Sequence, residues 1–550
     1  MSTLELNPLW IKGIRARCRW KNILGWGAIW LTIATFVFLV TYVTMVEQEL
    51  TTSADAAKAA LPGILVIQAV ILMLFGTGAV ASGVSQERDE GLLDYVRMTP
   101  MRPSAKVIGT LFGMPAREYL LFFATLPLVA IIVVISGFSL LTLGHFYLVF
   151  FSSVWVYHMT AMVVGMASPR PRLASMMSMG LVLLLYFALP NLSRIGITFF
   201  EFLTIRPTFL GMIQQELPDH LRAQAELNGI DTYRPVPFFE GAIQPTVYSL
   251  LVQGFIIITM FSIVHRKWRD QSHHLFSKAG GLLVFSGITV FTIASLWAIV
   301  SQEEAYRQLF NPLRRQSAEG RVPETLFFLM LTCFMIIGGA FLFMMCALTP
   351  SADCTRAGIR HARRLGHTRI AWNADAASSL PVALVMLAIT IGAGVGIVSL
   401  AVARGDYMAS GPSAVSTFAA VLLVIAVGLS IQGAAQRMSL KLFGVMTFLF
   451  WMVPCFATII LFAAFEAFEA GLYVSQPFPP SSIGYALSWM LETTAPPATY
   501  EGGFRFMPPE DEFTTSPARI VFTGAIGYAC LAVLIQRMSL KHRRHLAQHA

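Results

Sequence analysis

The sequence predicts an all-α, polytopic membrane protein of about twelve transmembrane helices, and three observations lead to this prediction. The 550-residue chain is 56% hydrophobic and only 13% charged, whereas soluble domains carry roughly 25% charged residues. Apolar runs of roughly 20 residues, the length that crosses a bilayer, recur along the whole chain. Basic residues gather in alternate loops, as the positive-inside rule requires of a polytopic protein.

The apolar runs give the expected spans in chain order. They cover residues 23–46, 62–86, 119–137, 144–167, 173–193, 246–264, 281–301, 325–348, 380–402, 415–433, 443–464 and 518–536. A cytoplasmic N-terminus assigns about two thirds of the lysines and arginines to cytoplasmic segments. We therefore expect both termini in the cytoplasm and a multi-pass protein of the plasma or inner membrane. This loop asymmetry explains the net charge of +9 without a nucleic-acid partner.

The two halves of the chain show the same order of landmarks. After an N-terminal segment, 1–22, each half has six spans, and the halves cover 23–278 and 279–550. The long cytoplasmic segments are 87–118 and 349–379, and the long external loops are 194–245 and 465–517. Because six spans return the chain to the same side of the membrane, we expect two parallel six-helix repeats.

The external loops have recognisable local patterns. In the first loop, Asp219 to Gly229 predicts a short capped helix, and Phe199 to Leu210 is apolar enough to lie at the membrane interface. The second loop is rich in proline around an apolar patch, Ile483 to Leu491. Both loops fit either a gate over an exit or a cap on the helix bundle.

Residues 85–110 form the most informative stretch, a charged segment between two strongly apolar runs. One face of a helix over 87–98 carries the apolar residues Leu92, Leu93 and Val96. The helix is expected to end near Thr99, because Pro100 disfavours helix in the residue before it. A much shorter loop would return the chain to the membrane, so this length favours a docking surface. A solvated loop without a partner is the alternative.

The order of residues in this segment resembles the cytoplasmic signature of ABC-2 type transporter permeases. The matching residues are Glu87-Arg88, Gly91, Leu92-Leu93-Asp94, Thr99-Pro100 and Gly109. The family's pattern is E-R-x-x-G-T-L-E-x-L-x-x-T-P-x-S, ending in G-K. This chain departs from that pattern with Leu92 for threonine, Asp94 for glutamate and Thr110 for the final lysine.

The N-terminus carries a second resemblance to the same family. Asn7-Pro8 is followed by the basic residues Lys12, Arg15, Arg17 and Arg19. This order resembles the N-P-x-x-x-K/R-E-L-R-x-R-x-R connecting helix that enters the first span of those permeases. Gly13 stands where the pattern has glutamate, which removes an expected acidic partner.

The resemblance implies an exporter permease whose ATPase is a separate subunit, expected in two copies. In that family the segment after the second span is a coupling helix, which lies in a cleft of the ATPase. The residues implied at that contact are Glu87, Arg88, Gly91, Asp94, Arg97, Thr99 and Pro100. ATP would bind the partner, and the exported substrate is not identified. Segment 349–379 lacks the same order and is either a divergent second dock or a solvated loop.

Motifs for chemistry on this chain are absent. No G-x-x-x-x-G-K-[ST] phosphate loop occurs, so the chain is not expected to be an enzyme that hydrolyses ATP. HExxH, GxSxG and metal-spaced Cys/His sets are also missing, so no catalytic, cofactor or metal site is expected. The basic surroundings of His273, His274, His542, His545 and His549 predict a solvated face. Scarce ionisable residues within the spans favour a transporter driven from outside the membrane.

Two other readings stay open. Twelve spans in two parallel halves also fit a major-facilitator-type secondary carrier, and the stretch from Gly83 to Gly91 matches the core of that family's G-x-x-x-D-R-x-x-G-R-[RK]. However, Leu92-Leu93-Asp94 stand where its basic residues follow, and the link between the halves, 265–280, is short. A membrane scaffold that uses a permease fold without transport is the third reading.

Overall fold

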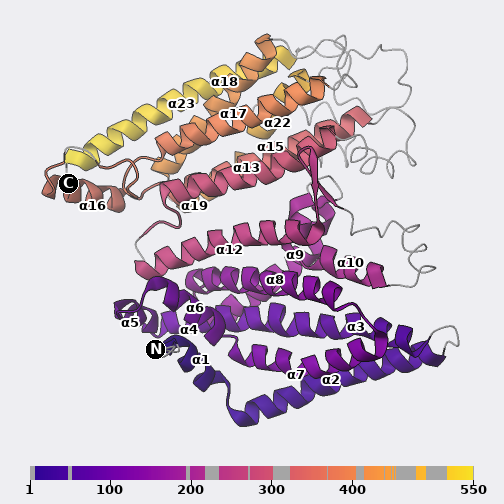
Figure 1. Cartoon of the computed structure of the whole chain (residues 1–550). Helices are drawn as coiled ribbons and strands as arrows, with labels where there is room; N and C mark the ends of the chain where they lie inside the picture. The colour runs from indigo at the N-terminus through magenta and orange to yellow at the C-terminus, as the bar shows by residue number, and fades with distance from the viewer. Residues whose placement is uncertain are drawn as a thin grey trace, which may run out of the picture. The chain divides into compact units, whose positions relative to one another are not determined.

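The three-dimensional structure is a computed structural model, in which nearly all the described residues are helical (Figure 1). The residues described are 7–47, 52–193, 198–216, 235–270, 273–301, 322–367, 370–403, 414–438, 440–447, 449–450, 453, 478–490 and 517–548. The chain divides into two compact units, and the change from the first to the second falls between His273 and His274. Residues 237–241 group with the second unit.

Ten helices among the described residues are long and apolar enough to cross a membrane. They are Trp20–Glu47, Ser53–Asp89, Ala116–Ser136, Leu140–Ala167, Pro245–Arg269, Lys278–Ser301, Leu329–Leu348, Leu380–Leu400, Ala414–Arg437 and Ala518–Gln548. The predicted all-α, polytopic membrane fold is thus confirmed. Of the two other predicted spans, 173–193 lies in helix α9, whose apolar part, Pro171–Phe187, is shorter. Most of 443–464 lies outside the described residues.

The first unit is built from helices in up-and-down order. They are α1 (Pro8–Arg17), α2 (Trp20–Glu47), α3 (Ser53–Ala69), the π-helix η1 (Val70–Gly76), α4 (Thr77–Asp89), α5 (Leu92–Met98), α6 (Pro103–Gly113), α7 (Ala116–Ser136), α8 (Leu140–Ala167), α9 (Pro171–Ser193), the 3-10 helix η2 (Thr198–Leu203), α10 (Arg206–Glu216) and α12 (Pro245–Arg269). A hairpin of β1 (Val236–Phe238) and β2 (Gly241–Ile243) precedes α12. The segments α3, η1 and α4 run on as one helix of 37 residues.

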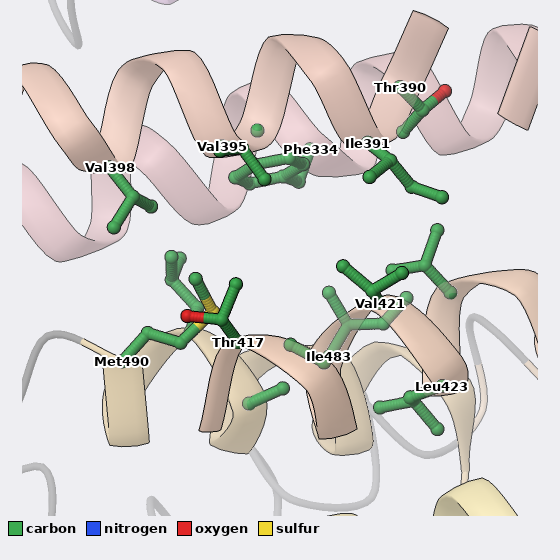
Figure 2. Close-up of a pocket in the computed structure, with 15 residues that line it drawn as sticks. Phe334, Thr390, Ile391, Val395, Val398, Thr417, Val421, Leu423, Ile483 and Met490 are labelled. Carbon is green, nitrogen blue, oxygen red and sulfur yellow. The ribbon is translucent and has the colours of Figure 1, made fainter. Parts of the chain in front are cut away.

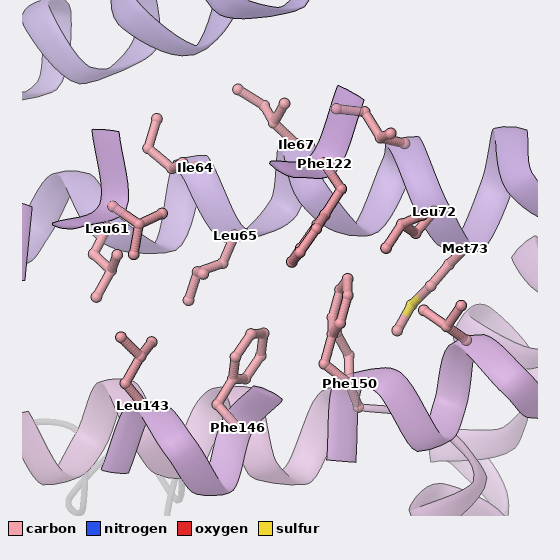
Figure 3. Close-up of a cluster of buried hydrophobic side chains, with 14 of the residues drawn as sticks. Leu61, Ile64, Leu65, Ile67, Leu72, Met73, Phe122, Leu143, Phe146 and Phe150 are labelled. Atoms are coloured by element: carbon pink, nitrogen blue, oxygen red, sulfur yellow. The ribbon is translucent and has the colours of Figure 1, made fainter. Parts of the chain in front are cut away.

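Close packing of large apolar side chains holds α3, α7 and α8 together. Leu65 of α3 points toward Phe146 of α8 in a cluster of buried side chains (Figure 3). Phe122 of α7 stacks on Phe150 of α8, with ring centroids 5.7 Å apart. Lipid tails are as apolar as these side chains, so shape and dispersion rather than the hydrophobic effect hold the helices against one another. By contrast, only 6% of the most apolar stretch of α2 is buried by the rest of the protein, as expected of a helix that faces lipid.

The second unit repeats this all-helical construction. Its helices are α13 (Lys278–Ser301), α15 (Val322–Leu348), α16 (Ala352–Arg364), α17 (Leu380–Ala403), α18 (Ala414–Arg437), α19 (Leu440–Thr447), α22 (Pro479–Met490) and α23 (Pro517–Gln548). Helices α18 and α23 lie side by side (Figure 1). Gly433 of α18 permits this approach, because a Cβ there would lie 2.6 Å from the Ile535 side chain.

The charged segment differs from the single helix predicted over 87–98. Helix α4 continues through Asp89, the chain turns at Gly91 with a left-handed φ of 73°, and α5 begins at Leu92. The predicted end at Thr99 is confirmed by its extended backbone (φ −66°, ψ 148°). After a short turn, residues Pro103–Gly113 form the further helix α6. Its first residue, Pro103, is pre-set for helix and lacks an N–H that would stay unpaired there.

The two long loops predicted to be external contain helices where the structure describes them. Residues 198–216 of the first loop form η2 and α10, and Phe199 and Phe202 are buried rather than free in solvent. The short helix predicted from Asp219 to Gly229 lies outside the described residues. In the second loop only α22 and the residue before it are described, and α22 takes up most of the predicted apolar patch.

The predicted N-terminal connecting helix is present as α1. The Asn7 side chain caps it by accepting the N–H of Leu9 at 3.0 Å, and it donates to the carbonyl of Ala105 in α6. Gly13 lies directly against Gly113 of α6, and a Cβ on Gly13 would overlap the Gly113 carbonyl. Gly13 therefore lets α1 and α6 touch backbone to backbone.

We expect Gly13→Ala to lower the stability of the purified protein by about 1–3 kcal/mol, because the new methyl group overpacks the contact between α1 and α6. Gly25→Ala is the matched control, since no atom lies within 4 Å of a Cβ built on Gly25. Thermal unfolding in detergent, followed by size-exclusion chromatography, measures both. Equal melting temperatures for the two variants would contradict the close helix contact.

Candidate functional site

Helix α5 is a short element outside the ten spans, and its two ends are fixed by different means. At its start, Gly91 adopts the left-handed conformation that an L-residue with a Cβ rarely takes. At its end, the Lys106 ammonium of α6 donates to the carbonyls of Arg97 (3.0 Å) and Thr99 (3.2 Å). A cation at the last carbonyls of a helix also interacts favourably with the negative end of the helix dipole. Burial lowers the pKa of Lys106 below its ordinary value.

One face of α5 is anchored in a buried cluster that we call the end cluster. It contains Leu93 and Val96 of α5. The other buried members are Val80, Ala81, Val84, Val107, Leu111, Met159, Ala161, Met162, Ala174, Val264 and Trp268. These residues come from α4, α6, α8, α9 and α12. The amphipathic pattern predicted for this segment thus places its apolar face against five other helices.

The opposite face of α5 is uncovered. The Tyr95 side chain is 66% exposed and Met98 is 79% exposed. Asp94 lies one turn before Met98 on the same side of the helix, and its side chain is 70% exposed and pairs with Arg97. An aromatic ring and a thioether beside a carboxylate, all open to solvent, form a compact patch that we call the α5 face.

The residues at the end of α4 point inward instead. The Glu87 side chain is only 11% exposed and accepts from the Lys12 ammonium of α1 at 2.6 Å. Arg88 donates to the carbonyls of Met166 (2.8 Å) and Ser168 (2.5 Å) at the C-terminal end of α8. Both side chains therefore position the end of α4 against its neighbours and leave little of themselves for an outside partner.

The seven residues implied by the family resemblance thus fall into two groups. The exposed ones are Gly91, Asp94 and Pro100. Those turned mainly toward the protein are Glu87, Arg88, Arg97 and Thr99. Tyr95 and Met98, which the sequence analysis did not select, are the most exposed large side chains of this segment. The helical spacing over 92–98 alone places Tyr95 and Met98 on the side of the helix opposite Leu93 and Val96.

The N-terminal helix contributes a further charge to this end of the unit. Arg17 donates to the carbonyl of Ala79 in α4 at 3.3 Å. Burial lowers the pKa of the Arg17 guanidinium, and the nearby Glu118 carboxylate partly offsets this effect. Glu118 lies in the first turn of α7, is 1% exposed and pairs with Arg117 at 2.5 Å.

Polar groups that the sequence analysis missed lie inside the spans of the first unit. Gln68 of α3 donates to Thr125 of α7 at 3.0 Å and accepts from the Tyr147 hydroxyl of α8 at 2.8 Å. His158 of α8 is fully buried, and its Nε2 lies 3.0 Å from the carbonyl of Leu72 in the π-helix η1. Such a histidine fits because a π-helix leaves carbonyls without their usual helical partners. In the sequence, the only sign of these buried contacts is that Gln68 and His158 are polar residues within apolar runs.

Segment 349–379 of the second unit forms a different structure. Its helix α16 is capped by Ser351, which accepts the N–H of Cys354 at 3.2 Å, and it ends before Gly366 at φ 74°. Arg363 donates to the carbonyl of Ala547 at the end of α23 at 2.6 Å. Its arginines Arg356, Arg360, Arg363 and Arg364 lie on α16. A docking role for this segment stays a prediction.

Among the described residues, no group of three or more His, Cys, Asp or Glu side chains could hold a metal ion. A narrow cavity of about 70 Å³ lies between α15, α17, α18 and α22 (Figure 2). Val395 and Val398 face Val421 and Ile483 across it, so it offers a surface almost without polar groups.

No protein-family model, no curated protein and no solved structure matches this chain. Its function must therefore be inferred from its own residues and their arrangement.

The ion pair between Lys12 and Glu87 can be tested by charge exchange. We expect Glu87→Lys to lower the melting temperature, because it brings two ammonium groups together in a half-buried site. Lys12→Glu/Glu87→Lys restores the attraction and recovers about 1 kcal/mol or more of the loss. The exposed Glu90→Lys is the control and should change stability by less than about 0.5 kcal/mol. If the stability changes of Lys12→Glu and Glu87→Lys simply add in the double variant, the pair is not a stabilising contact.

Proposed function

We propose that this chain is the permease subunit of an ATP-driven, ABC-2 type exporter whose ATPase is a separate subunit. The observation that carries the proposal is the two-sided character of α5. One face is packed into the end cluster by Leu93 and Val96, and the α5 face is uncovered. A helix held this way outside the spans is suited to receive a push from a soluble partner.

The contacts around α5 supply a path for such a push. Two residues, Glu90 and Gly91, join α5 to α4, and Lys106 ties it to α6. The end of α4 is in turn fixed to α1 through Glu87 and to α8 through Arg88. Helix α4 continues through η1 into α3 over 37 residues, so a displacement of α5 moves a whole span. Rigid elements of this kind carry conformational changes between distant sites.

The chemistry of the α5 face also suits a protein partner. Aromatic side chains and methionine are enriched at the cores of protein interfaces, whereas aspartate is usually found at their rims. Tyr95 and Met98 would fill an apolar depression in the ATPase, and Asp94 would meet a basic group beside it. ATP would bind that partner, and this chain would supply the path for the exported substrate.

A secondary carrier is the second candidate, and the buried polar groups of the first unit favour it. Ionisable or polar side chains inside a span often mark an ion path, and His158 and Gln68 are such groups. Their contacts with Leu72, Thr125 and Tyr147 satisfy a π-helix carbonyl and a local hydrogen-bond chain. They therefore have structural roles that do not require ion transport.

The α5 face can be tested without disturbing the buried anchors. We expect Tyr95→Ala/Met98→Ala to weaken association with the ATPase at least tenfold, because truncated interface anchors lose most of the binding energy. The measurement is co-purification of the full-length, tagged chain in mild detergent, with the bound ATPase quantified by ATP hydrolysis and by mass spectrometry. An unchanged elution profile and melting temperature would show that the variant is folded.

Leu365→Ala/Trp372→Ala is the matched variant in the second unit, since both side chains are large, apolar and exposed. Retention of the ATPase by this variant alone would indicate a single dock at α5. Loss in both variants would indicate two docks. An ATPase that stays bound to both, or no ATPase with the wild-type chain, would overturn the proposal and favour the secondary carrier or the scaffold.

A further inference from the structure

A cavity of about 420 Å³ lies in the second unit, where α16 meets the C-terminal part of α23. The residues that determine its chemistry are His274, Ser351, Arg437, Ser539, His542 and Arg543. On α23 they recur at spacings of three and four, so they lie on one face of that helix. The volume falls within the range of small-molecule sites.

The cavity is strongly basic. No carboxylate is among its lining residues in the part of the chain that the structure describes. The buried ammonium of Lys278 is repelled by Arg543 and attracted by the Asp375 carboxylate, and it donates to the carbonyls of Ala377 (2.6 Å) and Ser378 (2.8 Å). Asp375 does not line the cavity, and its carboxylate accepts the N–H of His274 at 3.3 Å. Neither Arg437 nor Arg543 has a carboxylate partner among the described residues. Cations gathered in this way cost free energy unless an anion offsets them.

Neutral donors at the cavity add to the charges. Ser351 caps α16 by accepting a single amide, that of Cys354, and the first turn of a helix carries several N–H groups without helical partners. The Ser539 hydroxyl already donates its hydrogen to Gln436, which donates to Ser378 at 2.8 Å, so the neutral donors that remain are the N–H groups at the start of α16. Planar guanidinium groups match the oxygens of a phosphate especially well. The combination fits a tetrahedral oxyanion better than a flat carboxylate.

The position of the cavity within the unit narrows the source of that anion. The cavity lies where the apolar part of α15 ends at Leu348 and where α23 becomes polar after Gln536. Phe443 and Leu546 add apolar walls, 5% and 2% exposed. Lipid headgroups occupy this depth, and basic pockets between helix ends bind anionic headgroups. We propose that the cavity binds a phosphate group, carried by an anionic phospholipid or free in solution.

The test measures how two phosphate sources affect the thermal stability of the full-length, purified chain after removal of lipid. One arm adds phosphatidylglycerol in mixed micelles, with phosphatidylcholine as its neutral counterpart. The other arm adds inorganic phosphate, with chloride at equal ionic strength. We expect at least one phosphate source to raise the melting temperature by several degrees, and Arg437→Gln/Arg543→Gln to need at least tenfold more of it for the same rise.

The matched control is Arg360→Gln/Arg364→Gln, which removes two exposed charges from α16 outside the cavity and should respond like the wild type. A response to phosphatidylglycerol alone would assign the site to a lipid headgroup, and one to both sources would assign it to the phosphate itself. A response to phosphate alone would assign it to a soluble anion. Equal responses of the cavity variant and the wild type, or none to either source, would overturn the proposal. Native mass spectrometry counts the lipids that stay bound to each variant.

Discussion

The need to pair every backbone carbonyl where water is scarce shapes this protein more than any single contact. Helices meet most of that need, and the exceptions are met by basic side chains. His158 contacts a carbonyl of the π-helix, Arg88 donates to a carbonyl at the end of α8, and Lys106 donates to a carbonyl at the end of α5. Lys278 does the same for two carbonyls before α17 in the second unit. Positively charged side chains at the helix ends thus complete the hydrogen bonding of the fold.

This use of charge explains why so few of the basic residues near α4 remain free for a partner. Lys12 and Arg88 are committed to contacts that fix α1, α4 and α8 at one end of the first unit. What remains on the outside of α5 is an aromatic ring, a thioether and a carboxylate. That surface is not strongly charged, so a partner bound there, as proposed above, would be recognised by shape more than by long-range attraction.

The sequence predicted what local rules control. Length and hydropathy revealed the spans, and Pro100 located the end of α5. It did not predict the break at Gly91, because glycine is tolerated within helices and only the packing of Leu93 and Val96 selects the left-handed turn. The exposure of Tyr95 depends on neighbours far away in the chain. The role of Gly13 was invisible for the same reason, since Gly113 lies one hundred residues later. His158 was missed because nothing in its own run indicates a π-helix in another span.

The π-helix η1 has a consequence for the direction in which α5 faces. A π-turn holds one more residue than the α-helical turn it replaces, and each residue of an α-helix turns the following chain by about 100° and advances it about 1.5 Å. Without that extra residue, α4 would present another side to α1 and α8, and Glu87 and Arg88 would miss their partners. The helical phase set inside the membrane at Val70–Gly76 thus determines which way an element outside it points. A single insertion or deletion in that span would change the direction in which α5 faces, several helical turns away.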